Sequence, residues 1–176
     1  MKHKMARLLV IFAFGACAVR AAYPSQQVQQ GLQQPDKRVD ELQKERDKLK
    51  REKDPVGHTK IDIRISEILL GFIGDSAKNG DFDQMQKQLQ EYSAVIDDAA
   101  DTMMKTGRDA NRHPGGFKDL EISLRHQMSR LEGLGQGLTF EHRDPVIKAK
   151  EIASGIRDRL IKALLIEDIR AQNDKS

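Results

Sequence analysis

The histidines are the first candidates for functional residues, because an imidazole can bind a metal ion or carry a proton near neutral pH. The chain has five of them: His3, His58, His113, His126 and His142. None lies three or four residues from another, so no helical turn presents a histidine pair, and no His-Glu-x-x-His motif is present. We therefore predict surface or loop histidines, and no catalytic, cofactor-binding or metal-binding residue.

A weaker alternative brings two histidines together. His58 and His142 each flank an Asp-Pro-Val sequence, at residues 54–56 and 144–146. If both sequences begin helices at the same end of a bundle, the two imidazoles approach one another beside Glu141, as a metal or pH-sensing site. Combined with the aspartates of the chain, they would form the least favoured function, a metal-dependent hydrolase.

Three carboxylates, those of Asp97, Asp98 and Asp101, share one side of a predicted helix. A carboxylate pair acts as acid and base when one member is buried and its pKa rises. These residues flank the apolar side of the helix, so we expect a solvated acidic face, neutralised by basic residues of other helices. The candidates for that role are Lys60, Arg64, Arg157, Arg159 and Lys162.

The segment from Asp75 to Gln86 follows the spacing of a calcium-binding EF-hand loop in part. Five of its positions match: Asp75, Asn79, Gly80, Asp81 and Asp83. Ala77 replaces the second oxygen ligand and Gln86 replaces the closing glutamate, so the loop lacks charge and coordination for calcium. We expect a junction between two helices here.

Several other chemistries lack their motifs. The sequence has no nucleophile elbow, phosphate loop or dinucleotide fingerprint, and the glycine-rich residues 133–137 follow a predicted helix instead of a strand. It has no tryptophan, and its basic residues are not interleaved with aromatic rings that could stack on bases. We expect a protein that is not an enzyme, holds no cofactor and does not bind nucleic acid.

Residues 1–21 have the pattern of a cleavable signal peptide. Lys2, Lys4 and Arg7 precede an apolar run over residues 8–19, which is shorter than the roughly 20 residues that span a bilayer. Two cleavage sites fit the small-residue rule, after Ala21 or after Ala18. Cleavage after Ala21 leaves 26 basic against 27 acidic residues, since that segment holds four basic residues and no acid. The expected location is periplasmic or secreted.

Cys17 is the one cysteine of the chain and lies inside this signal. Cleavage after Ala21 removes it, so the mature protein would have no disulfide and no thiolate. In the alternative, residues 14–17 resemble a lipoprotein box and Cys17 is acylated, although Phe14 stands where such boxes hold leucine. The chain would then be a membrane-tethered envelope lipoprotein.

Two further segments precede the predicted core. Residues 22–35 form a glutamine-rich leader with too few apolar residues to order a backbone. Residues 36–53 interleave charges of both signs and carry only a thin stripe of Val39, Leu42 and Leu49. That pattern predicts a charged, solvated helix, which lies along the core or projects from it as a short coiled-coil arm.

The core is predicted over residues 54–171, followed by a polar tail at 172–176. Its clearest element is a helix whose apolar residues recur at steps of three and four: Phe82, Met85, Leu89, Tyr92, Ile96, Ala99 and Met103. Other helices have to cover this seam, so the sequence predicts an all-α fold, an antiparallel four-helix bundle built from two helical hairpins.

Capping residues predict where these helices begin and end. Asp54 and Asp144 each precede a proline that suits a first helical turn, Asp81 starts the central helix, and Gly80 closes the helix before it. Residues 61–65 also alternate as a strand would, but the apolar spacing continues beyond strand length, which favours a helix. Residues 133–137 should fray the third helix, because glycine costs about 1 kcal/mol in a helix interior.

Together these features predict an exported, bacterial-type helical protein that acts without enzymatic chemistry as a protein-interaction or structural module of the cell envelope. Its expected partner is another protein or a second copy of itself, as a homodimer. Contact with a membrane is expected only if Cys17 is acylated or the signal is uncut.

Overall fold

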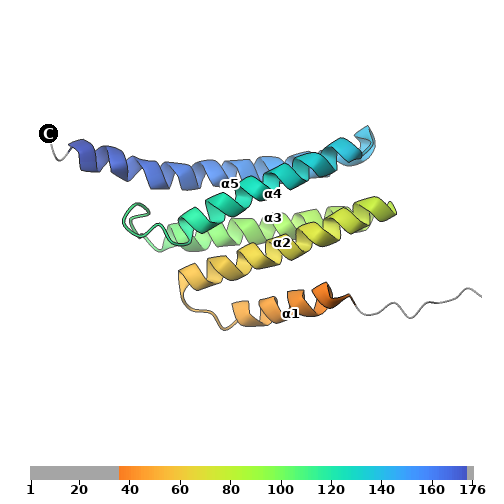
Figure 1. Cartoon of the computed structure of the whole chain (residues 1–176), viewed down its shortest axis with the longest axis horizontal. Helices are drawn as coiled ribbons and strands as arrows, with labels where there is room; N and C mark the ends of the chain where they lie inside the picture. Colours follow the sequence, from red (N-terminus) through yellow and green to blue (C-terminus); the bar gives the residue numbers. More distant parts are fainter. Residues whose placement is uncertain (1–35, 174–176) are drawn as a thin grey trace, which may run out of the picture. The chain divides into compact units, whose positions relative to one another are not determined.

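The computed structural model describes residues 36–173, and within that range it is all-helical, with five helices and no strand (Figure 1). The predicted signal peptide with Cys17, the leader of residues 22–35 and the end of the tail at 174–176 lie outside the described residues. The helices are α1 (Lys37–Leu49), α2 (Pro55–Asn79), α3 (Phe82–Lys105), α4 (Phe117–Gly137) and α5 (Phe140–Asn173).

Both ends of α2 form as the capping residues predict. The side chain of Asp54 accepts a hydrogen bond from the backbone N–H of Gly57 at 2.9 Å, with Pro55 in the first turn. Gly80 closes the helix in the left-handed conformation, with φ of 72°. Residues 61–65 are helical, so the strand alternative is wrong; here the apolar face that continues to Ile73 decides the structure.

The apolar seam of α3 is the centre of the core, as predicted. Asp81 caps α3 by accepting from the N–H of Gln84 at 3.1 Å. Six of the seven seam residues are buried and Phe82, at the first turn, is partly buried. Burying each such side chain contributes roughly 1.5–3 kcal/mol, so this stripe carries much of the stability of the core.

The helices form two antiparallel hairpins. In the first, Thr59 near the start of α2 contacts Ala99 late in α3, while Ser76 late in α2 bonds Gln88 early in α3. In the second, the beginning of α4 lies beside the middle of α5, and its end lies beside the first turns of α5. Short connections between the paired helices enforce this direction.

Between the hairpins, however, neighbouring helices run parallel. α2 lies along α4, with Lys60 near Asp119 and Ser66 bonded to Gln127, and α3 lies along α5 in the same way. The loop of residues 106–116 connects the hairpins and is long enough to let parallel helices become neighbours. Neighbouring helices are therefore antiparallel within each hairpin and parallel between the hairpins.

α1 lies alongside α2 and is not a detached arm (Figure 1). Leu42 is buried against the core, and Arg38 donates to Asp75 of α2 at 2.6 Å. Val39, predicted to share the apolar stripe, is exposed. Of the two placements that the sequence left open for this helix, the structure has the one along the core.

Two predicted helix ends are wrong, both near the α4–α5 turn. α4 continues through its three glycines to Gly137 without fraying, since Gly135 is buried beneath Val146 of α5 and packing overrides propensity. α5 begins at Phe140, so Asp144 is no cap and Pro145 lies inside the helix. Pro145 is the sixth residue of α5, where a proline removes a backbone hydrogen bond and its ring crowds the carbonyl of residue 141, at a cost of about 3 kcal/mol. The helix nonetheless continues through it, and its first turn stacks His142 on Phe82 of α3.

A polar layer crosses the apolar core and ties three helices together. The Tyr92 hydroxyl donates to Gln127 Oε1 at 3.0 Å, and Gln127 Nε2 donates to the hydroxyls of Ser66 and Ser123 at 2.9 and 2.8 Å. All four side chains are buried, and each has a partner. A satisfied network of this kind favours one register of α2, α3 and α4 over others.

None of the five described helices combines the length and the apolar character needed to cross a membrane.

Candidate functional site

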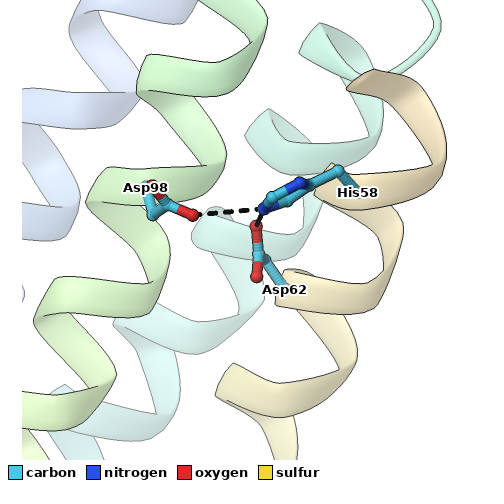
Figure 2. A group of neighbouring side chains, drawn as sticks. All are labelled: His58, Asp62 and Asp98. Atoms are coloured by element: carbon cyan, nitrogen blue, oxygen red, sulfur yellow. Dashed lines mark hydrogen bonds and ion pairs between the residues drawn. The ribbon is translucent and has the colours of Figure 1, made fainter. Parts of the chain in front are cut away.

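The titratable groups that converge in this fold are His58, Asp62 and Asp98. His58 and Asp62 lie one turn apart near the start of α2, so both project from the same side of that helix. Asp98 comes from α3, forty residues further along the chain, and the antiparallel hairpin brings it opposite them (Figure 2). Within residues 36–173 this is the one group of histidine, cysteine and acidic side chains arranged to hold a metal ion.

The imidazole of His58 stands between the two carboxylates. Its Nε2 lies 3.2 Å from Asp98 Oδ2 and 3.4 Å from Asp62 Oδ2, and the three donor atoms all lie within 4.8 Å of one another (Figure 2). The contact to Asp98 is a hydrogen bond, whereas Asp62 Oδ2 has no hydrogen-bond partner. The three side chains therefore lie together, but one carboxylate oxygen of the site has no hydrogen bond.

Asp62 forms the floor of the site and Asp98 its solvent side. The Asp62 side chain is 1% exposed and that of Asp98 is 60% exposed. Burial raises the pKa of Asp62 to about 7; His58 lowers it and the charge of Asp98 raises it. Among the ion pairs of residues 36–173, neither carboxylate has a lysine or arginine partner, so His58 is their shared basic group.

Neighbouring contacts hold the two helices at this level. Thr59, the residue after His58, is buried and donates its hydroxyl to the backbone carbonyl of Ala99 at 3.4 Å. Ala99 follows Asp98 directly, so this bond fixes the register of the two helices beside the site. The chemistry open to such a site is cation binding through one nitrogen and two oxygens, or proton exchange within the cluster.

The structure does not bring His58 and His142 together. The ring of His142 stacks on Phe82 with centroids 3.5 Å apart, at the start of α3. His58 lies against Asp98, sixteen residues later on α3, which corresponds to about 24 Å of helix. The hypothesis of a joint site with Glu141 is therefore wrong, because the parallel packing of α3 and α5 puts the starts of α2 and α5 at opposite ends.

The three aspartates of the predicted acidic face, Asp97, Asp98 and Asp101, do not all share one partner. Arg159 of α5 contacts Asp97 at 2.9 Å and Asp101 at 3.8 Å, which confirms one predicted neutralising residue, while Asp98 faces His58. The other four candidates do not contact these aspartates: Lys60 pairs with Asp119, Arg64 with Glu41 and Arg157 with Glu121, and Lys162 has no ion pair among the described residues.

The segment between Asp75 and Gln86 is a junction between two helices, as expected. Asp75 bonds Arg38 of α1, Gly80 closes α2 and Asp81 caps α3. The carboxylates of Asp75 and Asp81 therefore serve two different local contacts.

Sequence reasoning missed Asp62 altogether. Its signal was present in the helical face of α2: Ile65, Leu69 and Ile73 are buried, and one step of three residues before Ile65 is Asp62. His58 was paired there with His142 and Glu141, and with no acid of its own helix. A search for a histidine and an acid four residues apart would have found the pair.

A second feature lies on the first turns of α5, where large apolar side chains are exposed. Phe140 is 82% exposed and Ile147, two turns later, is 43% exposed. On one side, a groove of about 410 Å³ lies between α3 and α5, and its walls include Leu89, Pro145 and Ile152. On the other side, a groove of about 190 Å³ lies between α4 and α5.

Comparisons of the chain with protein families, with curated proteins and with solved structures find no match.

Proposed function

We propose that this chain is an exported helical module of a cell envelope that acts by protein contact and without enzymatic chemistry. In this proposal α2 to α5 form a four-helix bundle, and α1 is a charged helix laid against it. The two hairpins and the contacts of α2 with α4 and of α3 with α5 support the bundle. The basic start and short apolar run of residues 1–21 support export.

The observation that carries the proposal is the exposed apolar surface at the beginning of α5. Phe140 and Ile147 are seven residues apart, so they lie on the same side of the helix, as anchors of a helical interface do. Aromatic side chains supply much of the binding energy at protein interfaces. Because the ring of Phe140 is 82% exposed, this chain leaves most of its apolar surface available to a partner. The surface therefore fits an apolar segment of a partner.

Polar groups border these anchors and would set the orientation of the partner. Asp144 and Lys148 line the groove between α3 and α5, next to Pro145 and Ala149. An apolar centre with a charged rim is the usual composition of a protein interface. The partner is a second copy of this chain or another envelope protein with an apolar helix.

Site-specific photo-crosslinking tests this surface. A photoreactive amino acid replaces Phe140 in the full chain expressed in an exporting host, and Ile122 of α4, another exposed apolar residue, is the matched control position. We expect a discrete adduct from position 140 that Ile147→Asp abolishes, and none from position 122. An adduct of twice the chain mass would identify a homodimer; equal adducts from both positions, or none from 140, would contradict the proposal.

The intact mass of the exported product tests localisation and separates the tethered alternative. A soluble species that begins at Ala22 or Val19 is the expected product of cleavage after Ala21 or Ala18. A membrane-bound species that begins at an acylated Cys17 would make the chain a lipoprotein, with residues 22–35 as its tether. Retention of Met1 in the cytoplasmic fraction would overturn export.

A further inference from the structure

Asp62 is an exception among the buried acids of this protein. Among the side chains of residues 36–165, three acids are buried, namely Glu45, Asp62 and Glu121. Glu45 pairs with Lys48 and Glu121 with Arg125 and Arg157, while Asp62 Oδ2 has no hydrogen bond. Leaving a buried carboxylate oxygen without a hydrogen bond costs about 1–3 kcal/mol, so this oxygen calls for an explanation, and a bound ligand is one.

The unpartnered oxygen points toward the two other donors of the site. Asp62 Oδ2 is directed at His58 Nε2, which in turn faces Asp98 Oδ2 on the opposite helix (Figure 2). An ion pair with a protonated His58 is the simplest other account of the cluster. It leaves Asp62 Oδ2 unbonded at 3.4 Å, because the hydrogen bond of Nε2 goes to Asp98.

The spacing of the donors fits a small tetrahedral metal ion. Zinc binds nitrogen and oxygen ligands at about 2.0–2.2 Å, which places neighbouring ligands of a tetrahedron about 3.3–3.5 Å apart. The measured separations from His58 Nε2 are 3.2 and 3.4 Å. The third edge, between the carboxylates, is within 4.8 Å, and Asp98 is exposed enough to rotate toward the ion.

The donor set also selects the class of metal. Calcium and magnesium take oxygen ligands in sets of six or more, whereas an imidazole nitrogen suits zinc and related transition metals. Two carboxylates and a neutral imidazole carry a charge of −2, which one divalent ion cancels. Three protein ligands leave a fourth position, and the exposure of Asp98 places it on the solvent side, where water can fill it.

We propose that His58, Asp62 and Asp98 bind one divalent transition-metal ion of the zinc class, which joins the start of α2 to the end of α3. The bond from Thr59 to Ala99 holds the helices in register for this ion. The site is independent of the surface around Phe140, so failure of either proposal leaves the other intact.

Zinc titration of the full chain, purified with a tag that contains no histidine and stripped with a chelator, tests the site. The probe is Zn²⁺ alone, followed by calorimetry, and Co²⁺ then reports four-coordinate geometry through its intense visible absorption. We expect one equivalent of zinc bound in the micromolar range or tighter. Absence of stoichiometric binding to the folded wild-type protein would overturn the proposal.

Three ligand variants and one control complete the test. His58→Ala, Asp62→Asn and Asp98→Asn should each weaken zinc binding by about 100-fold or more, since changes even beyond the ligands cost 10- to 100-fold. Asp98 is exposed, so its variant keeps the test valid if a change in α2 prevents folding. Asp97→Asn, on the same helix and paired with Arg159, should bind as wild type. Equal losses in the control and ligand variants, or wild-type binding in Asp98→Asn, would overturn the assignment.

Discussion

Two buried carboxylates of this protein have opposite environments. Glu121 at the α4–α5 contact accepts from Arg125 at 2.6 Å and from Arg157 at 2.9 Å. Asp62 at the α2–α3 contact has one shared histidine and an oxygen without a hydrogen bond. Satisfied charges hold a structure in one arrangement, while an unsatisfied one leaves binding capacity unused. The comparison therefore separates a carboxylate that stabilises the fold from one available to a ligand.

The pKa values of Asp62 and Glu121 shift in opposite directions, because burial raises the pKa of a carboxyl group and neighbouring arginines lower it. Burial raises the pKa of both, but at Glu121 the hydrogen bonds and charges of Arg125 and Arg157 outweigh it and hold the pKa below its ordinary value. At Asp62 burial prevails and the pKa is about 7. The two groups differ in depth as well as in partners, since Asp62 is 1% and Glu121 is 7% exposed, and Glu121 has two arginine partners.

The largest expected effect comes from removing both partners of Glu121. The double variant Arg125→Met/Arg157→Met keeps the apolar stems of both side chains but leaves a buried carboxylate without a cation. We expect the free energy of unfolding to fall by about 3 kcal/mol, as measured by urea denaturation. A loss below about 1 kcal/mol would mean that Glu121 turns to solvent and that the comparison with Asp62 does not hold.

The same chemical change should have opposite effects at the two sites. Glu121→Gln removes two charge-assisted hydrogen bonds and should lower the free energy of unfolding by about 1–2 kcal/mol. Asp62→Asn, with a chelator present, removes a buried charge that lacks a hydrogen bond and should leave stability unchanged or raise it by about 1 kcal/mol. Denaturation of wild type and of both variants measures the two changes in the free energy of unfolding. A loss in Asp62→Asn equal to that in Glu121→Gln would show that Asp62 is a structural residue.

Acid sensitivity should be linked to Glu121. Because its pKa is below the ordinary 4.5 in the folded protein, it contributes stability that is fully present above that value and is lost as pH falls through the folded pKa. We expect the free energy of unfolding of wild type to decline more steeply below about pH 4.5 than that of Glu121→Gln. Parallel acid titrations followed by circular dichroism make the comparison, and identical profiles would contradict it.

The smallest effect is expected on the exposed acidic face. Asp97 pairs with Arg159 at 2.9 Å, but both side chains are about half exposed, and surface pairs of this kind contribute little. Asp97→Asn should change the free energy of unfolding by less than about 0.5 kcal/mol. A larger loss would place part of the α3–α5 contact energy in this pair instead of in the apolar core.

The sequence was informative wherever local chemistry decides the structure. Asp54, Gly80 and Asp81 were correctly predicted at helix ends, since a cap depends on a few neighbouring residues. The seam of α3 was correct because a period of three and four residues fixes which face is buried.

The errors arose where packing between distant segments decides. The sequence 144–146 repeats 54–56, yet Pro145 lies inside α5, which begins at Phe140 and stacks His142 of its first turn on Phe82 of α3. The site was missed for a related reason: Asp98 meets His58 across forty residues, and only the register of α2 against α3 brings them together. The burial of Asp62, by contrast, follows the local pattern, since it lies three residues before Ile65 on the buried face of α2.

Thermal unfolding with and without zinc tests the contrast between the two carboxylates most directly. A ligand that binds only the folded state raises its stability, by about 2.7 kcal/mol at one hundred times Kd, so Tm should rise by several degrees. We expect that rise in wild type and in Glu121→Gln, and none in Asp62→Asn. If zinc leaves wild type unchanged, or raises Tm equally in Asp62→Asn, Asp62 is not available to a metal ligand and the contrast fails.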